Sequence, residues 1–270
     1  MYKAKGSDRP DSLLRTIVAA LKHFCSAKFD DYNPFDTYMN RLLLALVKTE
    51  TKRPLQRTKI MPVEPFVALF RTWADNDNLS IKKLRQKTVA LIALTALCRP
   101  SDLAPKAIFK RSQISENADG SLTVNFFGIK NDRNMQGFEI RIQKSSDNKV
   151  DPVDCLLTYL TRTDHLTTPD GPVFLPISGS PPLKQVDSST IASDLRDIIR
   201  LAGLPSHFTP RCFRPTGATV AVHEGGNDRD IRQLGRWKTE EVFYQHYVYP
   251  NSKTNITDSI LKSDLNLFDS

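Results

Sequence analysis

The feature that most constrains the fold is an apolar segment that follows a predicted helix start at Ser80. Its second half, VALIALTALC (89–98), is apolar on every side of a helix. A helix without a polar face is buried at the centre of a domain. The segment ends at Arg99-Pro100-Ser101-Asp102, so the chain places a guanidinium and a carboxyl group at the mouth of its core.

A second constraint comes from the stretch 207–249. Thr209 and Pro210 have the character of a helix cap and a first-turn residue. Arg211 and Arg214 then lie three residues apart, which predicts that both guanidiniums share one face near the positive end of that helix. Two cations so placed are suited to binding a phosphate. Gly225-Gly226 supplies the positive φ that ends the helix.

Two further short helices are predicted in the same stretch. One begins after Asn227 and ends before Trp237. The next begins at Thr239, with acidic residues in its first turn, where they suit the helix dipole. It carries Tyr244 and Tyr247.

Two segments show the alternation of a β-hairpin. Apolar and polar residues alternate over 122–126 and again over 138–142, which predicts a pair of antiparallel strands. Helical periodicity also appears at 63–73 and 152–160, and from Ser188 or Ser189, as the cap, to an end at Gly203. The predicted fold class is therefore mainly α with a small antiparallel β-hairpin or sheet (α+β).

The composition limits the kind of partner and of chemistry. The 270 residues carry a formal charge of +8, which fits a polyanionic partner. The chain has no apolar run of roughly 18 residues and no signal-peptide core, so we expect no membrane association and an intracellular location. The four cysteines form no C-x-x-C pair, and we expect neither a metal nor a cofactor.

The order of two arginines, a Trp and a Tyr on a separate helix resembles the second half of the tyrosine recombinase (phage integrase) family. The segment LGRWKTEEVFYQHYV is most similar to the recombinases of eukaryotic mobile elements of the crypton and DIRS kind. By this resemblance Arg214 is the second catalytic arginine, Arg211 replaces the usual His or Lys, Trp237 stands at the His/Trp position and Tyr247 is the nucleophile. The spacing from Trp237 to Tyr247 is one residue longer than in bacterial relatives, so Tyr244 stays an alternative.

The resemblance extends to two earlier motifs. CRPSDL matches the motif of the family's first catalytic arginine, with Arg99 in that role and Asp102 as its supporting acid. From the residues alone, Arg99 as a cation capping its own helix stays open. Lys130, at the end of the first hairpin strand, matches the lysine that protonates the leaving 5′ oxygen. Arg133 in the same turn stays protonated and is a poor proton donor.

The resemblance also suggests a domain organisation. Residues 1–50 would be part of the helical core-binding domain that clamps DNA, either only its last part or a reduced form of it. Residues 51–60 would be a linker that either lies along phosphates or is simply solvated. Residues 61–250 would be the catalytic domain, and 251–270 a tail with a possible trans-packing helix. The residues expected to bind DNA are Lys52, Arg53, Arg57, Lys59, Arg133, Arg232 and Lys238.

The implied function is site-specific DNA recombination through a covalent 3′-phosphotyrosyl intermediate, without metal or ATP, for integration or excision of a mobile element. The expected partner is double-stranded DNA, bound by a homodimer to homotetramer, in the nucleus if the source is a eukaryote. Two alternatives stay open. One is a catalytically silent, domesticated DNA-binding protein of the same fold, and the other is a type IB topoisomerase.

Overall fold

The computed structural model describes residues 59–105, 109–129, 132 and 136–248, together with Thr16, Ala19, Ala20 and His23 in helical conformation. The chain divides into two units, Met1–Arg57 and Thr58–Ser270. The fold described below is that of the second unit. The predicted sites at Lys52, Arg53, Arg57, Lys130 and Arg133 lie outside the described residues.

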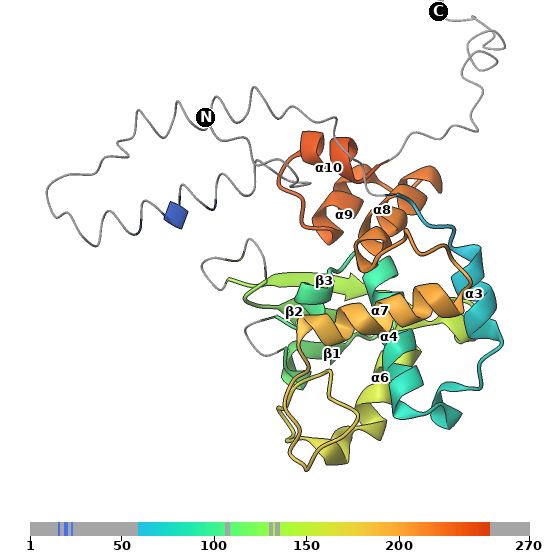
Figure 1. The fold of residues 1–270 in the computed structure, drawn as a ribbon, viewed down its shortest axis with the longest axis vertical. Helices are drawn as coiled ribbons and strands as arrows, with labels where there is room; N and C mark the ends of the chain where they lie inside the picture. The colour runs from blue at the N-terminus through green and yellow to red at the C-terminus, as the bar shows by residue number, and fades with distance from the viewer. Residues whose placement is uncertain are drawn as a thin grey trace, which may run out of the picture. The chain divides into compact units, whose positions relative to one another are not determined.

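Helix α4 (Ile81–Thr95) is the centre of this unit, as its sequence predicts. Ser80 caps it by accepting a hydrogen bond from the Lys83 amide, and ten consecutive residues from Leu84 to Ala93 are buried. It packs against three other helices: α6 (Pro152–Arg162), α7 (Ser188–Leu201) and α8 (Phe213–His223) (Figure 1). The helix ends at Thr95 rather than at Cys98, because Leu97 takes a left-handed φ of 52° and turns the chain.

That turn leads directly into α5 (Pro100–Leu103). Arg99 is the N-cap residue of α5, and its amide donates to Asp102 Oδ2 at 2.9 Å. Arg99 thus begins α5, four positions after the last residue of α4. The short helix fixes the carboxylate of Asp102 beneath the Arg99 turn.

The sheet has three antiparallel strands in the order β1-β2-β3. Strands β2 (Leu122–Phe126) and β3 (Phe138–Ile142) form the predicted hairpin, with Val124 opposite Ile140. Strand β1 (Ile114–Glu116) pairs with β2 and was not predicted, since three residues are too short to show alternation. The molecule is therefore mainly helical with a small antiparallel sheet, which confirms the predicted fold class.

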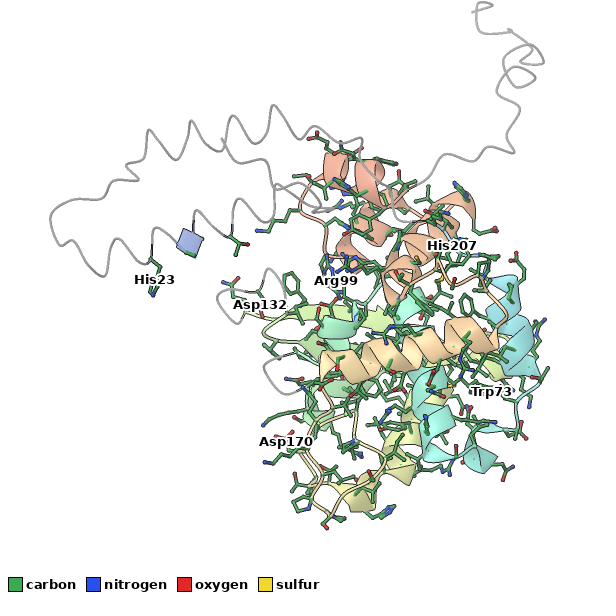
Figure 2. The ribbon with its side chains drawn as sticks, viewed as in Figure 1. His23, Trp73, Arg99, Asp132, Asp170 and His207 are labelled. Carbon is green, nitrogen blue, oxygen red and sulfur yellow. The ribbon has the colours of Figure 1, made fainter. Side chains whose placement is uncertain are left out.

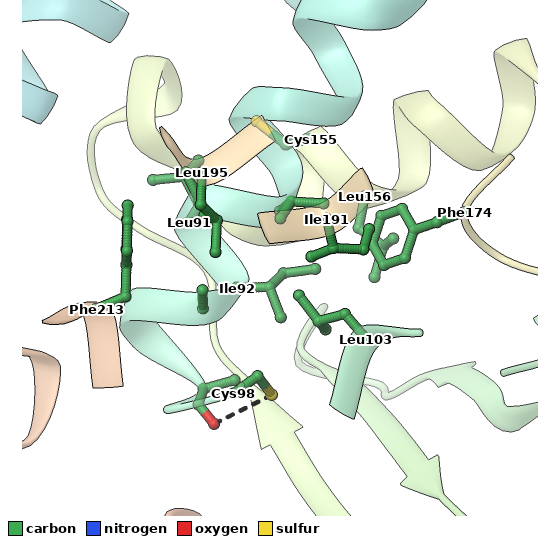
Figure 3. Close-up of a cluster of buried hydrophobic side chains, with 14 of the residues drawn as sticks. Leu91, Ile92, Cys98, Leu103, Cys155, Leu156, Phe174, Ile191, Leu195 and Phe213 are labelled. Atoms are coloured by element: carbon green, nitrogen blue, oxygen red, sulfur yellow. Dashed lines mark hydrogen bonds between the residues drawn. The ribbon is translucent and has the colours of Figure 1, made fainter. Parts of the chain in front are cut away.

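Helices α3 (Glu64–Arg71), α6 (Pro152–Arg162) and α7 (Ser188–Leu201) complete the main body. Asp187, rather than Ser188 or Ser189, caps α7 by accepting from the Thr190 amide. The core lies between α4, α6 and α7. Figure 3 shows Leu91 and Ile92 of α4 among Leu156, Ile191 and Leu195 of the neighbouring helices.

The remaining helices gather at one end of the unit: α8 (Phe213–His223), α9 (Asp228–Leu234) and α10 (Glu240–His246) (Figure 1). They surround a second, smaller apolar core, whose buried members are Leu97, Ala218, Ile231, Trp237, Phe243 and Val248. Gly217 allows α8 to approach α4 closely, because a Cβ at this position would lie 2.1 Å from the Leu94 carbonyl oxygen. Asp102 and the arginines around it lie at the junction of the two cores.

Candidate active site

The carboxylate of Asp102 is completely buried and is surrounded by three guanidinium groups. Arg236 Nη2 lies 2.8 Å from Asp102 Oδ2, and Nη1 atoms of Arg99 and Arg214 each lie 3.9 Å from the same oxygen. Of the three arginine side chains, that of Arg99 is the most exposed, at 28%. Figure 2 shows Arg99 where the helices α8 to α10 meet the main body.

Backbone carbonyls hold Arg214 in place. Its Nη1 donates to the Leu97 oxygen at 2.8 Å, and its Nη2 donates to the Gly235 oxygen. Both carbonyls lie in tight turns. The turns contain Leu97 (φ 52°) and Arg236 (φ 59°), which are the non-glycine residues with positive φ in the described part of the chain. Such strained conformations cluster at functional sites.

An aromatic pair covers the other side of Arg214. The guanidinium carbon lies 4.3 Å from the centre of the Trp237 ring and 5.4 Å from that of Tyr247. The two rings are 4.6 Å apart. Cations in this position are attracted by the electron-rich face of an aromatic ring. The Tyr247 side chain is thereby held beside two of the predicted catalytic residues.

The local sequence explains how Tyr247 reaches this place. Thr239 caps α10, as predicted, by accepting from the Val242 amide. Phe243 is fully buried against Trp237 and anchors the helix, and Tyr247 is the C-cap residue one turn later. The Thr219 hydroxyl donates to the Tyr247 carbonyl oxygen at 2.9 Å, which ties this end of α10 to α8.

The electrostatic surroundings change the acidity of Tyr247. Burial by itself raises the pKa of its phenol, but the charges of Arg214 and Arg99 oppose this, and the donor groups of Arg99 and Trp237 add to their effect. The net result is a pKa below the ordinary value of 10.0. Burial, with the charges of Arg99 and Arg236, lowers the pKa of Arg214 to about 9. A phenol beside cations is more easily ionised and is thus a better nucleophile.

Tyr244 points elsewhere. Its hydroxyl donates to the Asp228 carboxylate at the start of α9, and its side chain is among the exposed hydrophobic groups. Of the two candidate nucleophiles, only Tyr247 contacts Arg214 and Trp237 in the described structure. Val242, next to Phe243, is 41% exposed and faces away from the second core.

Arg211 does not join the cluster in this structure. The turn Pro210–Cys212 is a 3-10 helix ahead of α8, and Arg211 is exposed while Arg214 is buried. Among the described residues Arg211 forms no hydrogen bond or ion pair with the groups around Asp102. Arg211 and Arg214 therefore do not present a shared face to solvent, because Arg214 is buried against the Leu97 and Gly235 carbonyls while Arg211 stays at the surface.

The described residues that were expected to bind DNA are all at least partly open to solvent. Lys59 and Lys238 are exposed. Arg232 is 28% exposed and forms an ion pair with Glu240, Nη1 to Oε2, at 2.8 Å. This pair links α9 to α10, so Arg232 has a structural partner as well as access to solvent.

The sequence reasoning missed Arg236. Arg236 follows a short helix and lies between Gly235 and Trp237. Only these neighbours carried a recognisable sequence signal. A basic residue next to an aromatic one in a turn is usually solvated. Its burial against Asp102 depends on a contact 134 positions away in the chain.

The fold matches known structures. A crystal structure of XerA recombinase superposes with a TM-score of 0.56 at 18% sequence identity, covering 94% of this chain and 85% of that one. XerH site-specific recombinase bound to its difH substrate gives a TM-score of 0.54 at 12% identity, with 90% and 69% covered. The chain has the fold of the tyrosine recombinases. A lambda integrase dimer bound to a core site gives a TM-score of 0.54 at 14% identity, with 91% of this chain and 60% of that chain covered.

The sequence itself is distant from characterised relatives. No protein-family model matches the chain, and no curated protein matches it by sequence. Within the described residues, no three His, Cys, Asp or Glu side chains come together as a metal site. No helix in the described part of the chain is long and apolar enough to cross a bilayer.

Proposed function

We propose that this protein is a tyrosine recombinase that cuts and rejoins DNA at specific sites, with Tyr247 as the nucleophile. The observation that carries the proposal is the contact of Tyr247 with the Arg214 guanidinium, which shares the carboxylate of Asp102 with Arg99. A nucleophile beside two phosphate-binding groups is what phosphoryl transfer without a metal requires.

In the proposed reaction Tyr247 releases its phenolic proton to solvent, and the resulting phenolate oxygen attacks the scissile phosphorus. A bond forms between this oxygen and phosphorus, the bond from phosphorus to the 5′ oxygen breaks, and Lys130 gives its proton to the leaving 5′ oxygen. The product is a 3′-phosphotyrosyl link and a free 5′ hydroxyl. The reverse attack by a 5′ hydroxyl rejoins a strand without ATP, because the energy of the broken bond is kept in the phosphotyrosine.

The remaining residues stabilise charge in this reaction. Arg99 and Arg214 bind the two non-bridging oxygens of the phosphate, which suits the planar fork of a guanidinium. Trp237 packs its indole ring beside the phosphate and directs its buried N–H to the reacting groups. Arg211, exposed and unpaired among the described residues, adds charge when DNA covers it. Asp102 supports the arginines.

The wider function follows the same resemblance. Residues 1–50 and the basic linker 51–60 are proposed to hold the far side of the duplex, in front of a catalytic domain at 61–250. The likeness of the motifs to crypton and DIRS recombinases points to integration or excision of a mobile element in the nucleus of a eukaryote. Since lambda integrase is found as a tetramer bound to a Holliday junction, we propose a dimer or tetramer on DNA here too, with 251–270 packing in trans.

The lowered pKa of Tyr247 bears on the silent alternative. A protein that only binds DNA gains nothing from an acidified phenol between two arginines, so this feature favours catalysis. A type IB topoisomerase would use the same groups but would relax supercoiled DNA as a monomer without a specific site. Assays of supercoil relaxation and of site preference separate these two activities.

The decisive experiment is covalent capture. The purified chain is incubated with a pool of nicked duplexes whose core sequence is randomised, so that cleavage releases a short fragment and traps the protein on the DNA. We expect an adduct that survives denaturation, and mass spectrometry should locate the nucleotide on Tyr247. Tyr247→Phe should abolish the adduct and Tyr244→Phe should retain it. The opposite pattern would transfer the role to Tyr244, and no adduct from any duplex would refute the enzymatic proposal.

A further inference from the structure

We propose that Arg236 is a positioning residue of the active site: it binds Asp102 and thereby keeps Arg99 and Arg214 available to the phosphate and to Tyr247. This inference rests on the proposed function. Arg236 would not touch the DNA. It would act through the carboxylate that the two catalytic arginines share.

The distances support this division of roles. The Asp102 Oδ2 atom is 2.8 Å from Arg236 but 3.9 Å from both Arg99 and Arg214. Arg236 therefore makes the short hydrogen-bonded ion pair, and the other two arginines make only longer contacts. An arginine that is already engaged in a direct bond with a buried carboxylate has less freedom to bind an incoming phosphate.

The side chain of Arg236 faces the interior. It is only 5% exposed, its guanidinium carbon lies 5.8 Å from the ring centre of Phe126 on β2, and its Nη2 also approaches the Leu97 oxygen at 3.5 Å. It thus fills the space beneath the Arg99 turn. The catalytic arginines lie on the other sides of Asp102, where Arg214 meets the rings of Trp237 and Tyr247.

The charge balance gives Arg236 a further role. Three guanidiniums around one carboxylate leave an excess of two positive charges. A phosphodiester brings one negative charge, and the attack of an ionised phenol brings a second, so the excess matches the charge that develops in the reaction. Without Arg236 the excess would fall to one, and Asp102 would draw Arg99 and Arg214 towards itself.

The backbone of Arg236 shows that the position is constrained. Its φ of 59° is unfavourable for a residue with a Cβ and is adopted between Gly235, whose oxygen accepts from Arg214, and Trp237, whose ring packs on Arg214. Strain of this kind persists only where surrounding contacts maintain it. The bond from Arg236 to Asp102 is such a contact, so it also fixes the turn that presents Gly235 and Trp237.

The test is a double-mutant cycle between Arg236 and Asp102 in the full chain. Arg236→Gly removes the side chain and relieves the strained φ, while Arg236→Lys keeps the charge and loses the fork. Each is combined with Asp102→Asn. The first readout needs no DNA: the ionisation of Tyr247, followed by NMR of ring-labelled tyrosine and assigned with Tyr247→Phe. The second readout is the rate of adduct formation on the nicked pool.

We expect Arg236→Gly and Arg236→Lys to raise the pKa of Tyr247 and to slow adduct formation about tenfold or more, with DNA affinity nearly unchanged. In the Asp102→Asn background the same substitutions should change both readouts little, since the carboxylate that would withdraw the arginines is gone. Such non-additivity marks residues that act through each other.

The matched control is Arg85→Lys, which weakens another buried Arg–Asp pair, that of Arg85 with Asp194. It should lower the melting temperature and leave the Tyr247 ionisation unchanged. Equal effects of Arg236 substitution in both Asp102 backgrounds, or none in either, would overturn the inference. If the wild-type chain forms no adduct, the proposed function fails, but the Tyr247 titration still decides whether Arg236 positions the arginines.

Discussion

Two buried groups of arginine and aspartate in this protein are built differently. In the main core, Arg85 of α4 and Asp194 of α7 pair one to one: Nε to Oδ2 at 2.7 Å and Nη2 to Oδ1 at 3.2 Å. The third nitrogen, Nη1, donates to the Leu175 oxygen at 2.6 Å. Every terminal group of this pair has a partner, and its charges cancel.

The group around Asp102 has neither property. Three guanidiniums share one carboxylate, and several buried polar atoms of this group have no partner among the described residues: Asp102 Oδ1, Arg214 Nε, and Arg236 Nε and Nη1. Unpaired buried polar atoms and an excess of buried charge both cost stability. The Arg85–Asp194 pair is complete within the fold, whereas the group around Asp102 carries excess positive charge. An anion bound beside Arg99 and Arg214 would balance that charge.

The largest effects are expected when one arginine is removed from each of the two groups in turn. Arg214→Ala should slow adduct formation on the nicked DNA pool by about 10³-fold, because it removes a charge that stabilises the reacting phosphate. Arg85→Ala should instead cost about 3–5 kcal/mol of unfolding free energy, since it leaves the Asp194 carboxylate buried and unpaired. Chemical denaturation and adduct kinetics per folded molecule measure the two effects.

Together, the stability and the rate of adduct formation distinguish the Arg85–Asp194 pair from the group around Asp102. If Arg85→Ala slowed adduct formation as strongly as Arg214→Ala in protein shown to be folded, the distinction between a structural and a catalytic group would be lost. Arg85→Lys provides a folded version of the control where Arg85→Ala melts too low to assay.

A smaller perturbation can displace Trp237 without removing any charge. A Cβ on Gly235 would lie 1.8 Å from the Trp237 ring, while the φ of −78° at Gly235 suits alanine. Gly235→Ala should therefore move the indole off Arg214 and slow adduct formation by roughly 10²-fold, as expected of a misplacement near 1 Å. Tryptophan fluorescence should change too, since Trp237 is one of two tryptophans.

Gly203→Ala is the matched control for this substitution. A Cβ there meets nothing within 4 Å, but the φ of 70° disfavours alanine. It should cost about 1–2 kcal/mol of stability and leave the fluorescence and the rate unchanged. Normal rates in folded Gly235→Ala would show that the place of the indole does not matter to the reaction.

The two regions should also differ in how a tyrosine responds to pH. Burial in the main core raises the pKa of Tyr159, whereas the arginines hold the pKa of Tyr247 below 10.0. In the folded state Tyr247 releases its proton before the unfolded chain does, so it adds stability as the pH rises towards 10. Tyr159 keeps its proton longer than the unfolded chain does, so its contribution is lost above about 10.

Denaturation curves at several pH values test this sign difference. Tyr247→Phe should remove a gain in stability at alkaline pH, and Tyr159→Phe should remove part of a loss. An ordinary titration of Tyr247 near 10 would mean that the arginines do not act on its phenol.

The smallest effect of a single substitution is expected at the surface. DNA affinity should fall by roughly 10³-fold or more between about 50 and 200 mM salt if on the order of six phosphates are neutralised. Lys238→Ala, at an exposed position between α9 and α10, should weaken binding slightly and reduce the salt slope by about one. Lys184→Ala, an exposed lysine between α6 and α7, should leave the slope unchanged. A flat salt response of the unmodified chain would contradict binding through phosphates.

Several features that depend only on neighbouring residues were predicted correctly from the sequence. Both hairpin strands were predicted at their observed bounds, and the helix caps Ser80, Asn227 and Thr239 each accept the expected backbone hydrogen bonds. The buried centre of α4 was also predicted. Local periodicity and capping chemistry are contained in a few consecutive residues, so they can be recognised without the fold.

The arrangement of the charged groups was decided by the tertiary structure. Sequence spacing placed Arg211 and Arg214 on one face, yet one is exposed and the other buried, and it gave no sign that Arg236 is the closest partner of Asp102. The sequence determined which residues could carry the chemistry. The packing of α8 to α10 against the end of α4 decided which of them meet, because a contact between groups 134 positions apart depends on the whole fold and not on local preference.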